Sequence, residues 1–319
     1  MSSLSKELDR YLSIRRSLGY ELALAEKLLR KFIAFADGED AKYLSTDLFL
    51  RWQTSFGRAN RQTWSQRLGV IRLFAQWVHG LDPGHEVPPH GLIPSRIRRG
   101  RPYIYSAEEI SRIIDAAAEL PSANGIRGLA YATLFGLIAV TGLRISEATS
   151  LDVDDVDLEN GVLTVRRGKL GKGRLLPLSE SAKIRLTVYS KERDRLLGGR
   201  PTSFFISKDG RRLSVARAQY YFAYVCQNIG LRPVQKSNRH GRRSGRGPRI
   251  HDLRHTFAVR TLADWYRMGK NPTQEMIKLT TYLGHADPEH TYWYIQAIPE
   301  LLDLACRRAE VSLEQGVRS

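Results

Sequence analysis

Apolar residues recur at helical spacing along the first part of the chain. Leu4, Leu8 and Leu12 begin a pattern with a period near 3.6 residues, which is typical of amphipathic helices. Two glycines interrupt this pattern and two polar residues are candidate N-caps of further helices: Gly19, Gly38, Thr46 and Asn60. The pattern predicts a small helical bundle over residues 1–80.

The helical period disappears over residues 81–104. This segment is rich in proline, glycine and arginine, which predicts an extended linker between two domains. Its basic residues Arg96, Arg98 and Arg99 would contact phosphates if the linker passed along a nucleic acid. The alternative is a flexible tether without a binding role.

Residues 105–319 are predicted to form a larger domain. A capping box at Ser106 and Glu109 starts a helix, and an almost wholly apolar helix follows at residues 126–140. Alternating segments around a glycine-rich tip then predict a β-hairpin. The hairpin strands are expected at residues 162–165 and 175–178, and a candidate further strand at 204–206. The remaining helices are expected at 179–197, 214–228, 252–268, 272–282 and 299–310. The predicted fold is mainly α with a small β-hairpin or sheet (α+β).

The net charge narrows the choice of partners. The 319 residues carry a formal charge of +17, and a 42% hydrophobic content supplies cores for two domains without disulfides. Such a field attracts a polyanion, with nucleic acid as the leading candidate. The chain has no apolar run near the roughly 18 residues that a membrane span needs. We therefore expect a cytoplasmic, nucleoid-associated protein with no membrane partner.

Basic residues gather in several segments. A stretch at 232–249 carries seven Lys or Arg residues and no acid, which is typical of a loop that phosphates order. The alternative for this stretch is an insertion without a binding role. For the arginines of the helical bundle, the alternative is a solvated helix face. Outside the linker, the candidate nucleic-acid-binding residues are Arg51, Arg58, Arg61, Arg67, Lys172, Lys236, Arg239, Arg242, Arg243 and Arg246.

The sequence offers one weak candidate for a metal site. His251 and His255 lie at i, i+4, a spacing that places two zinc ligands on one helical face. Arg254 would lie beside the cation, however, and the two cysteines, Cys226 and Cys306, are far apart in the sequence. We expect neither a metal nor another cofactor.

Six separated residues carry the candidate chemistry. Arginine forks bind phosphate oxygens at two points, a lysine or imidazole can transfer protons, and a phenol can become a covalent nucleophile. The candidates are Arg144, Lys169, His251, Arg254, His285 and Tyr294. Together they suit a phosphodiester attacked by a tyrosine.

The segments around these residues resemble a known family. The motifs TGLRISE, GKLGKGRLLPL, HDLRHTFA and LGH, with a tyrosine nine residues after the last histidine, resemble those of the tyrosine recombinases, or phage integrase family. The resemblance covers about Ser106 to Ala309. It implies a two-domain, C-shaped DNA clamp with a core-binding domain at 1–80 and a catalytic domain with a C-terminal tail helix at 105–319.

The resemblance also assigns a role to each candidate. Arg144 and Arg254 would hold the scissile phosphate, and Lys169 would be the general acid. His251 would fill the acid/base position, and His285 would hydrogen-bond to the phosphate. Tyr294 would be the nucleophile. Lys172 is the alternative general acid, and Tyr292 is a rival nucleophile by sequence alone.

The activity implied is site-specific recombination through a 3′-phosphotyrosyl intermediate, for integration, excision or transposition of a mobile element. The implied partners are double-stranded DNA and further copies of the chain. The protein would be monomeric or weakly associated when free and would form a tetramer on two DNA sites. Accessory recombinases or directionality factors are additional candidate partners. The tail helix is expected to dock on a neighbouring subunit, or else to fold back in cis. The alternatives are relaxation of DNA as by a type IB topoisomerase, and a catalytically silent DNA-binding protein.

Overall fold

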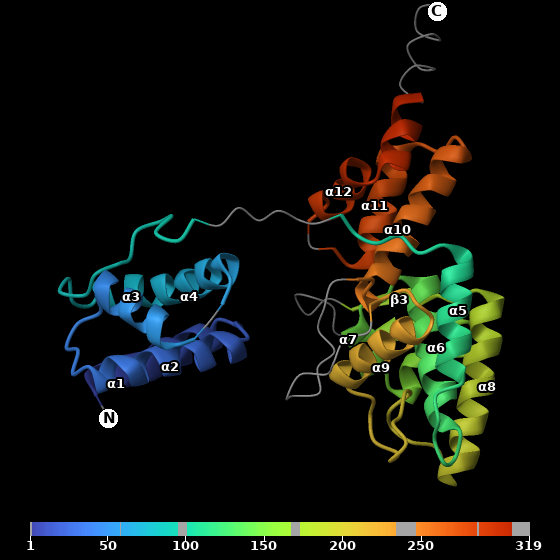
Figure 1. Ribbon diagram of the computed structural model, residues 1–319, viewed down its shortest axis with the longest axis horizontal. Coiled ribbons are helices and arrows are strands. Elements are labelled where there is room, and N and C mark those ends of the chain that lie inside the picture. The colour runs from blue at the N-terminus through green and yellow to red at the C-terminus, as the bar shows by residue number, and fades with distance from the viewer. Residues whose placement is uncertain are drawn as a thin grey trace, which may run out of the picture. The chain divides into compact units, whose positions relative to one another are not determined.

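The computed structural model describes residues 2–57, 59–94, 101–166, 173–233, 247–285 and 287–307. The chain divides into two compact units, Met1–Gly100 and Arg101–Ser319, which are coloured blue to cyan and green to red in Figure 1. Each unit has its own hydrophobic core.

The described residues of the first unit form a bundle of four helices, α1 (Ser3–Ser17), α2 (Ala23–Gly38), α3 (Thr46–Ser55) and α4 (Arg61–His79). The predicted N-cap Asn60 is confirmed, because its side chain accepts a hydrogen bond from the backbone N–H of Thr63 at 2.8 Å. The prediction for Thr46 was wrong by one position. Ser45 is the cap and accepts from Leu48 N at 3.0 Å, so Thr46 is the first helical residue.

Aromatic side chains fill the core of this bundle. Trp52 lies between Phe32 and Trp64, with ring centroids 5.3 and 5.5 Å away in edge-to-face contacts. Trp52 is 1% exposed, so most of its large apolar surface is removed from water. The apolar period of the sequence thus becomes one shared interior.

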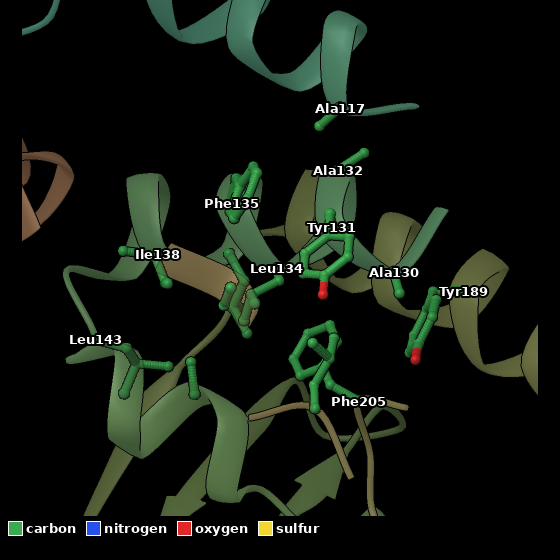
Figure 2. Close-up of a cluster of buried hydrophobic side chains, with 14 of the residues drawn as sticks. Ala117, Ala130, Tyr131, Ala132, Leu134, Phe135, Ile138, Leu143, Tyr189 and Phe205 are labelled. Atoms are coloured by element: carbon green, nitrogen blue, oxygen red, sulfur yellow. The ribbon is translucent and has the colours of Figure 1, made fainter. Parts of the chain in front are cut away.

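The second unit is organised around α6 (Ile126–Thr141). This helix packs against α5 (Ala107–Ala118), α8 (Glu180–Leu197) and α9 (Val215–Asn228), and also against α10 (Ile250–Arg267). Figure 2 shows part of the core that α6 contributes, with Tyr131, Leu134, Phe135 and Ile138 among the labelled side chains. Because neighbours cover several of its sides, an almost wholly apolar helix is stable here.

A small antiparallel sheet lies beside this helical core. It has the order β1 (Val156–Asp157), β2 (Val162–Val165) and β3 (Arg174–Pro177), and β2 and β3 form the predicted hairpin. The candidate strand at residues 204–206 was wrong. Ile206 makes only an isolated bridge with Arg212, and the third strand is β1, which follows the 3-10 turn Val153–Asp155.

The last part of the second unit has a separate core. Helices α10, α11 (Pro272–Leu283) and α12 (Glu289–Ala297) pack together, as the orange and red ribbons of Figure 1 show, and residues 299–307 are helical after them. Ile298 and Leu301 are buried against this core. These two residues of the tail thus contribute to the core of their own chain, and docking of the tail helix on a neighbouring subunit stays a prediction.

Candidate active site

Arg254 is a buried cation held by two backbone carbonyls. It lies in the second turn of α10, is 2% exposed, and donates to Gly142 O and to Leu283 O, each at 2.7 Å. Burial lowers its pKa to about 10, and the charge of Arg144 acts in the same direction. The guanidinium is still protonated at neutral pH, so its position and charge are both set before any ligand arrives.

Two glycines make this anchoring possible. Gly142 ends α6 with φ +62°, and a Cβ there would meet the Phe257 ring at 2.5 Å. Gly284 follows α11 with φ +65°, and a Cβ there would meet the guanidinium of Arg174 at 2.9 Å. Both turns need the left-handed conformation that favours glycine, and both bring carbonyls close to the arginines.

Arg144 directly precedes the short helix α7 (Ile145–Ser150). Its side chain donates to Glu147 Oε1 at 2.7 Å and to Gly284 O at 2.8 Å. Its own N–H donates to Glu147 Oε2 at 3.0 Å, in a capping arrangement. Arg174 was not among the site residues predicted from the sequence. Arg174 lies at the start of β3 and donates to both oxygens of the same carboxylate, at 3.1 and 2.9 Å.

Glu147 is therefore a buried carboxylate shared by two arginines. Burial alone would raise its pKa, but the hydrogen bonds and charges of Arg174 and Arg144 outweigh burial and lower the pKa to about 2. The carboxylate neutralises part of the positive charge and fixes the position of Arg144, which is the more exposed of the two arginines.

Replacing Glu147 by glutamine is expected to lower the free energy of unfolding at pH 7 by about 3 kcal/mol, because two partly buried guanidiniums lose the buried carboxylate that they share. The folded pKa of Glu147 lies below its unfolded value of 4.5, so its contribution is present above about pH 4.5 and is lost as the pH falls towards 2. Urea unfolding of both proteins at pH 7 and pH 3 should show a smaller difference at pH 3.

A matched control is Glu192→Gln, which breaks an exposed i, i+3 pair with Arg195 on α8. Surface pairs of this kind contribute little, so this variant should unfold like the original chain at both pH values. If the Glu147 variant lost the same stability at pH 3 as at pH 7, shared neutralisation by the carboxylate would be the wrong explanation.

His285 lies in the turn between α11 and α12. Its Nδ1 is 2.7 Å from Thr291 Oγ1, and Thr291 in turn contacts Thr280 Oγ1 at 3.0 Å. Burial, followed by the positive charges of Arg254 and Arg144, lowers the pKa of His285 to about 3. The imidazole is therefore neutral at pH 7, and its ring is tied to both flanking helices.

His251 lies in the first turn of α10, one turn before Arg254 and His255. Desolvation, followed by the charges of Arg254, Arg249 and Arg144, lowers its pKa. Because the residue is exposed, solvent and salt screen the influence of these charges on its pKa. Its ring lies 4.7 Å from the ring of His255, centroid to centroid.

Tyr294 is buried, with 2% of its surface exposed, on α12. Its Oη is 2.8 Å from Nδ1 of His255. From the sequence, His255 was a candidate only as a metal ligand, and this contact was not predicted. Its spacing from His251 was visible in the sequence, but its proximity to Tyr294 was not.

The structure brings five of the six catalytic candidates to one place. Three of them meet at the turn 283–285. Arg254 donates to Leu283 O, Arg144 donates to Gly284 O, and His285 is the last residue of the turn. His255 joins the others, since it contacts both His251 and Tyr294. Lys169 and the alternative Lys172 lie outside the described residues.

The candidate DNA-binding residues have varied surroundings. Arg51 is exposed and forms ion pairs with Glu39 and, at 2.9 Å, with Asp47. Arg61 is exposed, and Arg67 lies over the Trp64 ring at 4.5 Å. The other candidates lie outside the described residues: Arg58, Arg96, Arg98, Arg99, Lys236, Arg239, Arg242, Arg243 and Arg246.

Within the described ranges, no three His, Cys, Asp or Glu side chains gather in a way that could hold a metal ion. Cys226 is buried and Cys306 is exposed, and both are free thiols. Among the described helices, none has the length and apolar character to cross a bilayer.

Known proteins resemble this chain in sequence and in fold. Residues 104–300 match the phage integrase family. A relative from Sinorhizobium fredii, "Putative integrase/recombinase y4rB", is 39% identical over 97% of this chain and 98% of its own length. Tyrosine recombinase XerC of Escherichia coli O6:K15:H31 is 28% identical over 76% of this chain and 74% of its own length.

Two solved structures share the fold at lower identity. The Tn1549 transposon integrase in complex with transposon right end DNA is 17% identical, covers 92% of this chain and 94% of its own, and has a TM-score of 0.62. A lambda integrase tetramer bound to a Holliday junction is 18% identical, covers 91% and 76%, and has a TM-score of 0.58. With its sequence matches and its cluster of arginines, histidines and a tyrosine, the chain belongs to the phage integrase family and is a tyrosine recombinase that acts in site-specific DNA recombination.

Proposed function

We propose that this recombinase cuts and rejoins double-stranded DNA through an ester between the DNA and Tyr294. The observation that carries the proposal is a connected cluster. Arg144 and Arg254 are held at the turn 283–285, Arg254 interacts electrostatically with Tyr294, and Tyr294 is joined to His251 through His255. In this arrangement a phosphodiester would have a nucleophile on one side and two fixed cations beside its oxygens.

Arg144 and Arg254 would hold the non-bridging oxygens of the scissile phosphate. The carbonyls of Gly142 and Leu283 accept from two of the five N–H donors of Arg254, and in this proposal remaining donors would bind the phosphate oxygens. Because these contacts already orient the guanidinium, little reorganisation is needed when charge develops on phosphorus. His285 would add a further hydrogen bond to the phosphate.

The chemistry is a transesterification. Tyr294 Oη forms a bond to phosphorus, the bond from phosphorus to the 5′ oxygen breaks, and that oxygen leaves with a proton from a general acid. Lys169 is proposed for this step, with Lys172 as the alternative and His251 in the acid/base position. A second 5′ hydroxyl then attacks the 3′-phosphotyrosine, so the ester itself supplies the bond energy for rejoining.

We propose that the biological role is integration, excision or transposition of a mobile element, carried out by a tetramer on two duplexes. Support comes from the relative named as an integrase/recombinase and from the fold shared with a transposon integrase. The lambda integrase neighbour is a tetramer on a Holliday junction. In this proposal residues 1–80 also bind the DNA.

The test begins with a pool of nicked duplexes of varied sequence. A denaturing wash retains only DNA that is covalently attached, and sequencing of that DNA identifies the site. A plasmid with two copies of the site should then give recombinant products. Relaxation of a single-site plasmid without recombination would instead favour the topoisomerase-like alternative, and the absence of any adduct would favour a silent DNA-binding protein.

Neutralising the basic segment is expected to weaken DNA binding and to flatten its dependence on salt. A variant with Lys236, Arg239, Arg242, Arg243 and Arg246 changed to glutamine should lose about 0.9 from the slope of log K against log salt for each phosphate contact removed. Fluorescence anisotropy with a labelled duplex at several salt concentrations measures this slope.

A control variant loses the same charge elsewhere, on α8 and in the turn after it, with glutamine at Lys183, Arg185, Lys191, Arg195 and Arg200. This control separates phosphate contacts from the long-range field of the protein. If both variants had the same salt slope as the original chain, the basic segment would have no phosphate contacts.

A further inference from the structure

The side chain of His255 is in direct contact with the proposed nucleophile. Its Nδ1 lies 2.8 Å from Tyr294 Oη, within hydrogen-bonding distance, although the two residues are 39 positions apart. A phenol must lose its proton as it attacks phosphorus, because its ordinary pKa is near 10. An imidazole nitrogen at this distance is placed to receive that proton.

The ring of His255 is held by three other rings. His251 lies edge-on with a centroid distance of 4.7 Å, Tyr294 lies at 5.5 Å, and Trp293 lies at 5.9 Å. His251 comes from the same helix and the other two come from α12, so the ring lies between two packed elements. This enclosure restricts rotation and keeps Nδ1 directed at the phenol.

The surroundings also set the protonation state of this base. Burial, followed by the neighbouring His251, Arg254 and Arg249, lowers the pKa of His255 to about 3. The imidazole is therefore neutral at pH 7 and has a free lone pair on one nitrogen. A phosphate bound beside Arg144 and Arg254 adds negative charge, which opposes these effects and makes His255 a stronger base when substrate is present.

We propose that His255 is the general base of the cleavage step. As Tyr294 Oη bonds to phosphorus, its proton passes to Nδ1 of His255, and the 5′ oxygen departs with the electron pair of the broken bond and a proton from the general acid. In rejoining, Nδ1 returns its proton to the phenolate as the ester breaks. This assignment rests on the proposed function, and it leaves His251 free to interact with the phosphate.

Two substitutions separate proton transfer from orientation. His255→Asn can place an amide oxygen near the position of Nδ1, so it retains a hydrogen-bond acceptor but cannot take up a proton. His255→Leu removes both properties. If His255 is the base, both variants should cleave a nicked substrate about 10² to 10⁴-fold more slowly in a single turnover. Thermal unfolding and DNA-binding measurements on each variant show that the loss is not one of folding.

A second substrate distinguishes the base from the acid. In a duplex whose scissile 5′ oxygen is replaced by sulfur, the leaving thiolate needs no proton, so loss of a general acid is rescued but loss of the base is not. The His255 variants should remain slow on this substrate, whereas Lys169→Ala should recover if Lys169 is the acid. Cleavage by His255→Asn at the original rate, or its rescue by sulfur, would overturn the proposal.

The same assay reveals a failure of the underlying function. If the original chain formed no adduct, or if the adduct persisted in Tyr294→Phe, the chemistry proposed for Tyr294 would be wrong. If the original chain formed an adduct that disappeared in Tyr294→Phe while His255→Leu retained the full rate, only the role of His255 would be wrong.

Discussion

Replacing Tyr294 by phenylalanine is expected to abolish the covalent DNA adduct, with single-turnover cleavage falling by about 10⁴-fold or more. The substitution removes only the hydroxyl that contacts His255, and the ring can still fill its buried position on α12. DNA affinity and thermal stability should therefore change little. Denaturing gel electrophoresis of protein incubated with a labelled nicked duplex measures the adduct.

The chain supplies a close control two residues earlier. Tyr292 is 44% exposed on the same helix, and by sequence alone it is an equally plausible nucleophile. Tyr292→Phe should form the adduct at close to the original rate. If the adduct disappeared in Tyr292→Phe and persisted in Tyr294→Phe, the nucleophile would have to be reassigned to Tyr292.

Replacing Arg254 by alanine is expected to slow cleavage by about 10² to 10³-fold, because the transition state loses a fixed hydrogen-bond donor. Stability should fall as well. The substitution leaves the carbonyls of Gly142 and Leu283 without these donors, at a cost of about 1 to 3 kcal/mol each where water cannot replace them. Single-turnover cleavage at saturating protein and urea unfolding measure the two effects separately.

Two further arginine variants make the result specific. Arg254→Lys keeps a charge but lacks the planar fork that serves two carbonyls and a phosphate together, so cleavage should remain strongly impaired. Arg260 lies on the same helix and donates to Tyr105 O at 2.9 Å, away from the cluster, so Arg260→Ala should cleave normally. If Arg254→Ala reduced DNA binding as much as cleavage, Arg254 would be a ground-state phosphate contact only.

Local sequence patterns predicted many elements of the fold. The capping box at Ser106 and Glu109 is confirmed, because both hydrogen bonds join residues three positions apart. Helix α6 was predictable from its apolar composition, and the hairpin from its alternating residues. Strand β1 was missed because two residues are too few to establish an alternating pattern.

Long-range contacts explain what sequence analysis missed at the site. Arg174 shares the carboxylate of Glu147 across 27 positions, and this pairing depends on how the hairpin packs against α7. The pair His251 and His255 was visible as a helical spacing, but it was interpreted as a candidate zinc pair. Only the packing of α12 on α10 brings Tyr294 to His255, and this contact is the basis for proposing that His255 is a general base.

The burial of Tyr294 has a consequence for when the proposed nucleophile can act. Only 2% of this residue is exposed, so on the proposed function the phenol has to be uncovered before phosphorus can come within about 3.5 Å of it. DNA that binds without uncovering the phenol would leave with its strands unbroken. Cleavage would then be confined to complexes whose binding energy can uncover Tyr294, and the latency of the nucleophile would protect other DNA from breakage.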